Sequence, residues 1–344
     1  MRAVFRTFLR FCFCAGVVVP WSAQALDGSQ LGVIVNTRDP LSVAIGAYYL
    51  QQRRIPEQNL IRVSFTPVED TLTRARFELL KAQVDEQTLP HIQAYAVTWM
   101  APYRVGCMSI TTALAYGYNP SFCAEGCRIT RPSPYYNAAT RLPYADLRIR
   151  PAMAIAAGTF EEAQALIDRG VASDGTFPGG TAYLLSTSDS ARNVRSTWFP
   201  LIEQTYPGRL RVRTLKQDAL RDAMDVLFYF TGRASVQGLE TLQFVPGAIA
   251  DHLTSYGGIL TAQNGQMSAL RWLEAGATGS YGTVAEPCNL TQKFPNPAVV
   301  IDRYLRGETL IEAYWKSVQM PGQGIFVGEP LAAPFRKPGK REGS

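Results

Sequence analysis

The feature that most constrains the fold of this chain is a series of short apolar runs without alternating polar residues. Residues 31–36 (LGVIVN), 93–100, 181–186 and 225–230 (DVLFYF) are of this kind. Strands of a parallel sheet have this composition because helices cover both of their faces. Segments with helical character, such as residues 41–54, separate the runs. The pattern predicts an α/β protein with a doubly wound, mostly parallel sheet.

Residues 225–288 are the part of the chain where we expect a site, because apolar or small-residue runs there end in glycine or small polar residues. Residues 225–230 predict a strand, residues 246–253 a short helix, and residues 254–260 a second strand. A run of small residues at 275–284 follows. Open α/β sheets build their sites at the edge where the carboxyl ends of parallel strands meet.

Residues 101–150 interrupt this succession of strands and helices. The segment is rich in Pro, Tyr, Gly and Asn, and it contains Cys107, Cys123 and Cys127. Long irregular segments inside compact domains are usually functional or held in place. We therefore expect an inserted, cysteine-rich irregular segment that is fastened by disulfide bonds. Its tyrosines either line a cleft or pack as ordinary loop aromatics.

The first 25 residues have the three parts of a secretory signal peptide. A basic start precedes the apolar run of residues 11–19, and an A-x-A sequence ends at Ala25. The run is shorter than the roughly 20 residues that span a membrane. We predict a periplasmic or secreted protein after cleavage near Ala25; in the alternative, an uncleaved signal provides the only membrane contact. Residues 26–336 are predicted to form one α/β domain, and residues 337–344 a polar tail.

Removal of the signal changes both the charge and the cysteine count. Three of the 34 basic residues lie in it, so 31 remain against 28 acidic residues. This small excess does not indicate nucleic-acid binding. Four of the six cysteines also remain: Cys107, Cys123, Cys127 and Cys288. An even number in an oxidising compartment predicts disulfide bonds, with three possible pairings. Cys123 and Cys127 either close a small loop or pair elsewhere.

Cys288 and His252 are the candidate nucleophile and base within residues 225–288, which we call the central stretch. A Cys288 thiolate activated by His252, with Asp251 or Glu286 orienting the imidazole, would make a cysteine hydrolase. Each residue also has a structural interpretation. Cys288 would be a disulfide cysteine in an exported protein, and His252 would be a packing or capping histidine.

Three further features of the sequence concern ligands. Arg233 follows Gly232 where a strand is expected to end, so its guanidinium either binds an anion or lies solvated at the surface. The only other histidine is His91, far from His252 in sequence, so we predict no metal site. Residues 275–284 lack the glycine spacing of nucleotide- and phosphate-binding loops, so we predict no cofactor.

Six ordered blocks extend over nearly all of the chain after the signal: residues 33–36, 42–56 (SVAIGAYYLQQRRIP), 230–232, 246–258 (PGAIADHLTSYGG), 275–287 and 307–315 (GETLIEAYW). Together they resemble an uncharacterised exported family of bacteria that carry the exosortase and PEP-CTERM sorting system. That family has no established activity. The resemblance implies a role in the envelope or in exopolysaccharide-linked protein export, with envelope proteins or glycans as partners. Glu329 departs from the expected Gly-Asp-Pro-Leu pattern.

A weaker resemblance concerns the fold. The order of strands, glycine-rich turns and the G-x-x-x-x-E-A helix that starts at Gly307 is similar to caspase-like domains, including gingipain-type peptidases. Those peptidases have His-Gly after one strand and Cys after the next, where this chain has residues 232–234 and 257–261. The resemblance implies a caspase-like core without its dyad. Our first hypothesis is a non-catalytic domain that acts by binding; the alternative is a hydrolase that uses Cys288 and His252.

Overall fold

The structure is a computed structural model that describes residues 25–66, 69–124, 126–206, 208–261 and 265–337. Except for Ala25 and Lys337, the predicted signal peptide and the predicted polar tail lie outside the described residues. None of the helices in these ranges is long and apolar enough to cross a membrane.

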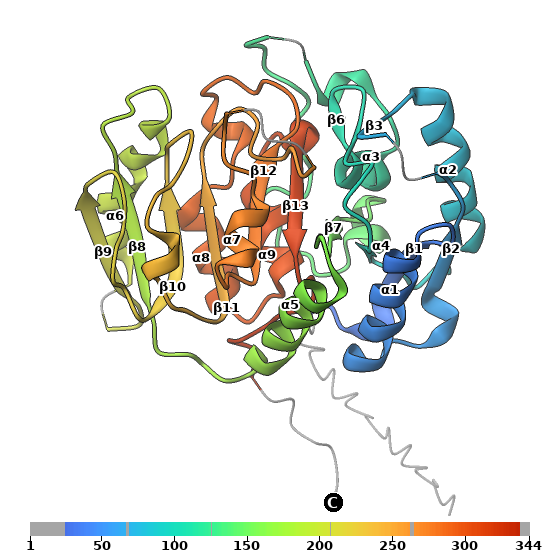
Figure 1. Ribbon diagram of the computed structural model, residues 1–344, viewed down its shortest axis with the longest axis horizontal. Helices are drawn as coiled ribbons and strands as arrows, with labels where there is room; N and C mark the ends of the chain where they lie inside the picture. The colour runs from blue at the N-terminus through green and yellow to red at the C-terminus, as the bar shows by residue number, and fades with distance from the viewer. Residues whose placement is uncertain (1–24, 67–68, 125, 207, 262–264, 338–344) are drawn as a thin grey trace, which may run out of the picture.

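A ten-stranded sheet runs through the molecule (Figure 1), in the order β2-β1-β4-β7-β13-β12-β11-β10-β8-β9. Its described pairings are parallel except that of β12 with β13. The predicted α/β fold class is thus confirmed. The strands are β1 Leu31–Asn36, β2 Leu60–Val63, β4 Ala94–Val97, β7 Ala152–Ala154, β8 Thr181–Ser186, β9 Arg211–Lys216, β10 Val226–Thr231, β11 Phe244–His252, β12 Gly279–Thr283 and β13 Gly324–Gly328.

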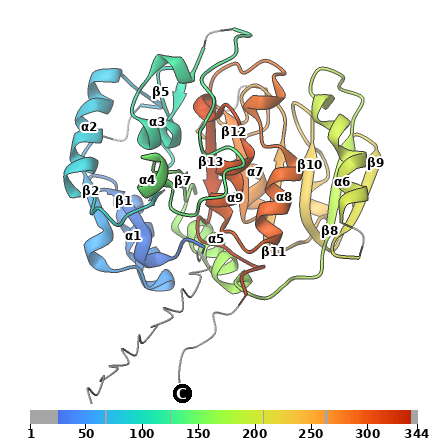
Figure 2. The ribbon, with the colours of Figure 1, turned by 180° about the vertical axis from the view of Figure 1, so that it is seen from behind.

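Helices cover both faces of the sheet. Figure 1 shows α1, α5 and α7 in front of it, and Figure 2 shows α6, α8 and α9 over the opposite face. Several helices begin at side-chain caps, as at Asp39, which precedes Pro40 and accepts a hydrogen bond from the Leu41 amide. The helices are α1 Pro40–Arg53, α2 Arg74–Gln87, α3 Ile110–Tyr116, α4 Pro143–Leu147, α5 Phe160–Ser173, α6 Phe199–Thr205, α7 Leu270–Glu274, α8 Pro297–Leu305 and α9 Leu310–Ser317, and the 3₁₀ helix η4 is Asn193–Trp198.

The last strand of the chain, β13, lies in the middle of the sheet between β7 and β12. It joins the strands of the first half of the chain to those of the second half. Phe326 on β13 stacks on Trp315 of α9 with ring centroids 4.6 Å apart. The Trp315 indole donates a hydrogen bond to the Ala152 carbonyl of β7 at 2.9 Å. Aromatic packing and a buried hydrogen bond thus hold the two halves together at this point.

Two element predictions in the central stretch are wrong. Residues 246–253, expected to be a helix, lie mostly in strand β11, and residues 254–260, expected to be a strand, form turns. A short buried apolar run has no periodicity that distinguishes a helix from a central strand. The pair Gly257–Gly258 allows the turn to contact β12, since a Cβ on Gly258 would lie 2.7 Å from the Gly282 carbonyl oxygen.

The segment 101–150 contains more regular structure than its composition predicts. Strands β5 (Arg104–Val105) and β6 (Met108–Ser109) form a small sheet with β3 (Thr71–Leu72). Helix α3 follows directly, and most of its residues are buried. These short elements cover fewer than half of the segment, and most of the remainder is irregular, as predicted. The predicted disulfide fastening is confirmed: Cys107 pairs with Cys123, and Cys127 pairs with Cys288.

Candidate functional site

The carboxyl ends of three neighbouring strands, β8, β10 and β11, meet at one edge of the sheet. Asp189, Arg192 and Thr254 lie in the loops there. Arg192 donates from Nε to Thr254 Oγ1 at 3.1 Å and from Nη1 to Asp189 Oδ2 at 3.0 Å. The Arg192 backbone lies against Gly232, where a Cβ would lie 1.9 Å from the Arg192 carbonyl oxygen. Glycine at 232 therefore allows the loops to meet. We call Asp189, Arg192 and Thr254 the edge cluster.

The edge cluster is partly open to solvent, and its guanidinium keeps donors for a ligand. The Arg192 side chain is 28% exposed. Within the described ranges, no residue accepts a hydrogen bond from Arg192 Nη2. A planar guanidinium with such a donor is suited to a carboxylate or carbonyl group. Sequence reasoning missed Arg192; the polar residues that follow strand 181–186 were the available signal.

A groove adjoins the edge cluster. It has a volume of about 450 Å³ and lies between the loop after β10 and helix α7. Ser235 and Gln266 contribute polar groups to its lining, the ion pair of Arg271 with Glu274 contributes charged groups, and Leu270 contributes an apolar surface. Thr254 connects the groove to the edge cluster because its hydroxyl donates to Gln266 Oε1. The volume lies in the range of small-molecule sites.

His252, the predicted base, is the last residue of β11 and is buried. Its Nδ1 accepts a hydrogen bond from the Trp272 indole at 2.9 Å. Its Nε2 lies 3.0 Å from the Met267 carbonyl oxygen, which requires the proton to be on Nε2. Burial lowers the pKa of His252 to about 3. The imidazole is therefore neutral, and both of its nitrogens have protein partners, as in a packing histidine.

Asp251 does not orient His252. Successive side chains of a strand point to opposite faces of the sheet, so the two residues lie on different faces. Asp251 instead forms a buried ion pair with Arg195 of η4 at 2.6 Å. Burial raises the pKa of Asp251, and the Arg195 charge opposes this shift. Arg195 also donates to the Thr231 carbonyl at 2.9 Å, so the pair fastens η4 to the sheet.

Cys288, the predicted nucleophile, is bonded to Cys127 and carries no thiol in this structure. The alternative in which Cys123 and Cys127 close a small loop is wrong. Glu286 Oε1 accepts hydrogen bonds from the Cys288 amide at 2.7 Å and from Ser255 Oγ at 3.1 Å. Glu286 thus shapes the loop after β12. None of the hydrogen bonds among the described residues joins His252 to Cys288 or to Glu286.

Arg233, the candidate anion-binding residue, already has a carboxylate partner. Its Nη1 lies 2.6 Å from Asp218 Oδ2 and donates to Ser188 Oγ at 3.2 Å. Its neighbours Ser188 and Asp218 follow strands β8 and β9. The Arg233 charge is thus already paired with a carboxylate, as that of Arg192 is with Asp189.

Nothing in the described ranges forms a group of three or more His, Cys, Asp or Glu side chains that could hold a metal ion. His91 lies elsewhere, where its Nε2 is 3.2 Å from Asn59 Oδ1. The donor set for a metal centre is therefore not present in this part of the chain.

Comparisons with known proteins define the class of fold. A solved structure described as a protease superposes with a TM-score of 0.50 at 10% sequence identity, and the match covers 90% of this chain and 79% of that one. A complex of the pro- and mature domains of Porphyromonas gingivalis RgpB gives a TM-score of 0.42 at 9% identity, over 89% of this chain and 80% of that one. No protein-family model and no curated protein matches the sequence. The chain shares the α/β fold of the first of these structures.

Proposed function

We propose that this protein is a non-catalytic caspase-like domain that acts by binding a partner in the bacterial envelope. The observation that carries the proposal is the composition of the sheet edge. The residues directly after β10 are Gly232 and Arg233, and those after β11 are Leu253, Thr254 and Ser255. Histidine and cysteine are absent from both places. Strand β11 ends at residue 252, so the residues that follow it are these and not residues 257–261.

The candidate catalytic residues also support a binding role. His252 is neutral and buried, and Cys288 is in a disulfide bond. A cysteine peptidase needs a thiolate and a base within hydrogen-bond reach. For the alternative function, a cysteine hydrolase, reduction of the disulfide would have to release the Cys288 thiol. A base other than His252 would then have to deprotonate it.

The binding surface we propose is the edge cluster with its adjoining groove. Arg192 supplies a cationic donor, and the groove supplies mixed polar and apolar walls. A carboxylate-bearing envelope protein or glycan matches this chemistry. The two disulfide bonds fit a periplasmic or extracellular protein, because such bonds persist in oxidising compartments.

A peptidase assay distinguishes the proposed function from the alternative. The wild-type protein and a Cys127→Ser/Cys288→Ser variant are incubated with a library of fluorogenic peptides, with and without mild reductant. We expect both proteins to show the same background rate in every condition. Hydrolysis by reduced wild-type protein that the double variant lacks would instead establish the hydrolase.

A cross-linking experiment in the producing cell tests the binding surface. A photoreactive amino acid replaces the exposed Ser190, beside the edge cluster, and in a control replaces the exposed Glu86 on α2. We expect a defined adduct from position 190 alone, and at least about tenfold less of it when Arg192→Ala removes the guanidinium. Equal adducts from the two positions, or none from position 190, would refute this surface.

A further inference from the structure

Helix α9 carries a carboxylate, Glu312, that is fully buried at 0% exposure. Its Oε2 accepts hydrogen bonds from Thr309 N at 2.9 Å, Thr309 Oγ1 at 2.7 Å and Leu26 N at 3.3 Å. Its Oε1 has no hydrogen-bond partner among the described residues. Burial raises the pKa of Glu312, since it disfavours the charged form. A buried carboxylate destabilises the fold unless donors and a cation compensate for the lost water.

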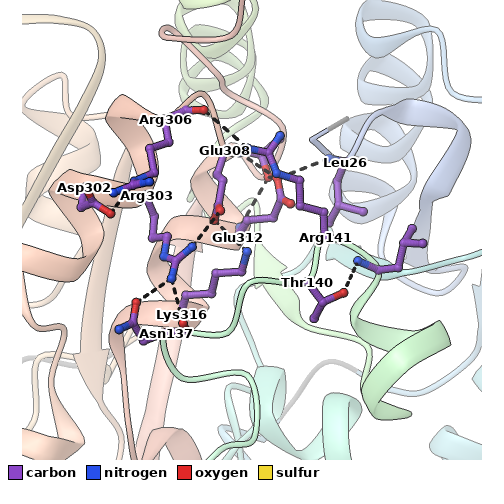
Figure 3. A network of polar contacts seen from close by, with 12 residues as sticks. Leu26, Asn137, Thr140, Arg141, Asp302, Arg303, Arg306, Glu308, Glu312 and Lys316 are labelled. Atoms are coloured by element: carbon purple, nitrogen blue, oxygen red, sulfur yellow. Dashed lines mark hydrogen bonds and ion pairs between the residues drawn. The ribbon is translucent and has the colours of Figure 1, made fainter. Parts of the chain in front are cut away.

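The cations near Glu312 are paired with a different carboxylate. Lys316 Nζ forms an ion pair with Glu308 Oε2 at 2.9 Å, and Arg303 Nη1 lies 3.5 Å from Glu308 Oε1 (Figure 3). Arg303 Nη2 also donates to the Asn137 carbonyl at 2.7 Å. The Lys316 charge acts on Glu312 and lowers its pKa against the effect of burial, but no ion pair between described side chains includes Glu312.

The group that does reach Glu312 is the backbone nitrogen of Leu26, 286 residues away in sequence. Leu26 is buried, and its carbonyl oxygen accepts a hydrogen bond from Arg336 Nη2 at 2.6 Å. The A-x-A sequence predicts cleavage directly after Ala25. Cleavage there turns this amide into an α-ammonium, which has three donors and a positive charge.

A second helix of the molecule shows that a capping box alone does not require this arrangement. Helix α5 has the same box, with Thr159 as cap and Glu162 as partner. Glu162 Oε2 accepts hydrogen bonds from the amides of Gly158 at 2.8 Å and Thr159 at 3.2 Å, and it lies at the surface. A capping-box carboxylate can therefore cap its helix while it is exposed to solvent. The burial of Glu312 against the start of the mature chain needs a separate reason.

We propose that the α-ammonium of Leu26, released by cleavage after Ala25, is the cation that pairs with buried Glu312 and fastens the new N-terminus to α9. The ammonium thereby gives Glu312 a cation in direct contact, and the mature chain is more stable than any form with a blocked or extended N-terminus. The proposal rests on the predicted cleavage after Ala25 and is independent of the proposed binding function.

The first test maps the N-terminus of the exported protein by mass spectrometry, where we expect Leu26. Thermal unfolding then compares the chain that starts at Leu26 with one that keeps Ala25, each with Glu312 intact or as E312Q. We expect the Leu26 chain to unfold at least about 3 °C higher than the Ala25 chain. E312Q should remove most of this difference. A mature N-terminus at another residue would overturn the proposal, as would a difference that E312Q leaves unchanged.

Glu162→Gln is the matched control, because it removes the capping-box carboxylate of α5 at a distance from Leu26 and should leave the difference intact. A second measurement does not depend on the stability of E312Q. The α-amino group of ¹⁵N-labelled Leu26 is titrated by NMR in the otherwise unchanged protein. We expect its pKa to lie above the ordinary range of about 7.7–8.0 for such groups. A pKa within or below that range would contradict the ion pair.

Discussion

At the scale of single residues, His252 links burial to the pH dependence of stability. Its pKa falls from an ordinary value of 6.5 to about 3 in the folded protein because it is buried. Below pH 6.5 the unfolded chain binds a proton that the folded chain does not, so stability decreases as the pH falls. We expect His252 to contribute a loss of about 2 kcal/mol in the free energy of unfolding between pH 7 and pH 5.

Urea unfolding of the wild type and of a His252→Gln variant at both pH values measures this contribution. Every other titrating group is present in both proteins, so the difference between their pH dependences isolates the imidazole. We expect the variant to lose less stability on acidification than the wild type does. Parallel pH dependences would show that His252 titrates as it does in the unfolded chain.

The contrast between sequence and structure at this scale lies in the partners of each residue. The sequence identified Cys288 as either a nucleophile or a disulfide cysteine, and the structure shows the disulfide with Cys127. Histidine at position 252 suggested a general base. The Trp272 indole that occupies its Nδ1 is brought there by the turn of the chain between β11 and α7. Neighbours of this kind are set by tertiary packing, which a single sequence does not display.

At the scale of elements, the two disulfide bonds fasten the segment 101–150 in different ways. Cys107 and Cys123 are 16 residues apart and close a local loop, whereas Cys127 and Cys288 are 161 residues apart and join this segment to the loop after β12. In the chain-entropy model a longer loop stabilises more, by about 3 kcal/mol for the first bond and about 5 kcal/mol for the second.

Two double variants compare these contributions: Cys107→Ser/Cys123→Ser and Cys127→Ser/Cys288→Ser. We expect the second to lower the free energy of unfolding more than the first, as measured by guanidinium denaturation under non-reducing conditions. Paired replacement avoids a remaining reactive thiol in either protein. If the local bond contributes as much as the long-range bond, loop entropy does not explain their effects.

Helices and strands were predicted correctly where the length of the segment and its capping residues indicated the same kind of element. The prediction failed where the segment was too short to show either. The run 31–36 and the capped helix after Asp39 appear in the structure within one residue of the predicted bounds. Residues 246–253 are too few to display a helical period, and the Pro-Gly pair at their start resembles a helix beginning. In the fold they form the end of a central strand that pairs with a strand on each side. The residues of this segment alone do not indicate that those neighbouring strands are present.

At the scale of the whole molecule, β13 and the residues after it join the two halves of the sheet. Glu329, directly after β13, is fully buried and receives hydrogen bonds from Tyr49 and Arg53 of α1. Arg53 also pairs with Asp174, which follows α5. This cluster connects the first helix of the chain to its last strand. Loss of Glu329 leaves the buried Arg53 with Asp174 as its remaining carboxylate, and breaking a buried pair typically costs about 3 kcal/mol or more.

We therefore predict that Glu329→Gln destabilises the whole molecule by about 3 kcal/mol, because β13 pairs with strands of both halves and makes the sheet one unit. Hydrogen exchange measured by mass spectrometry should show equal decreases in the opening free energy of β1 and β10. Asp302→Asn, which breaks the exposed Arg306–Asp302 pair at 2.7 Å, is the control and should cost less than about 1 kcal/mol. If Glu329→Gln destabilised β1 and left β10 unchanged, the first four strands would be a separate folding unit and β13 would not make the sheet cooperative.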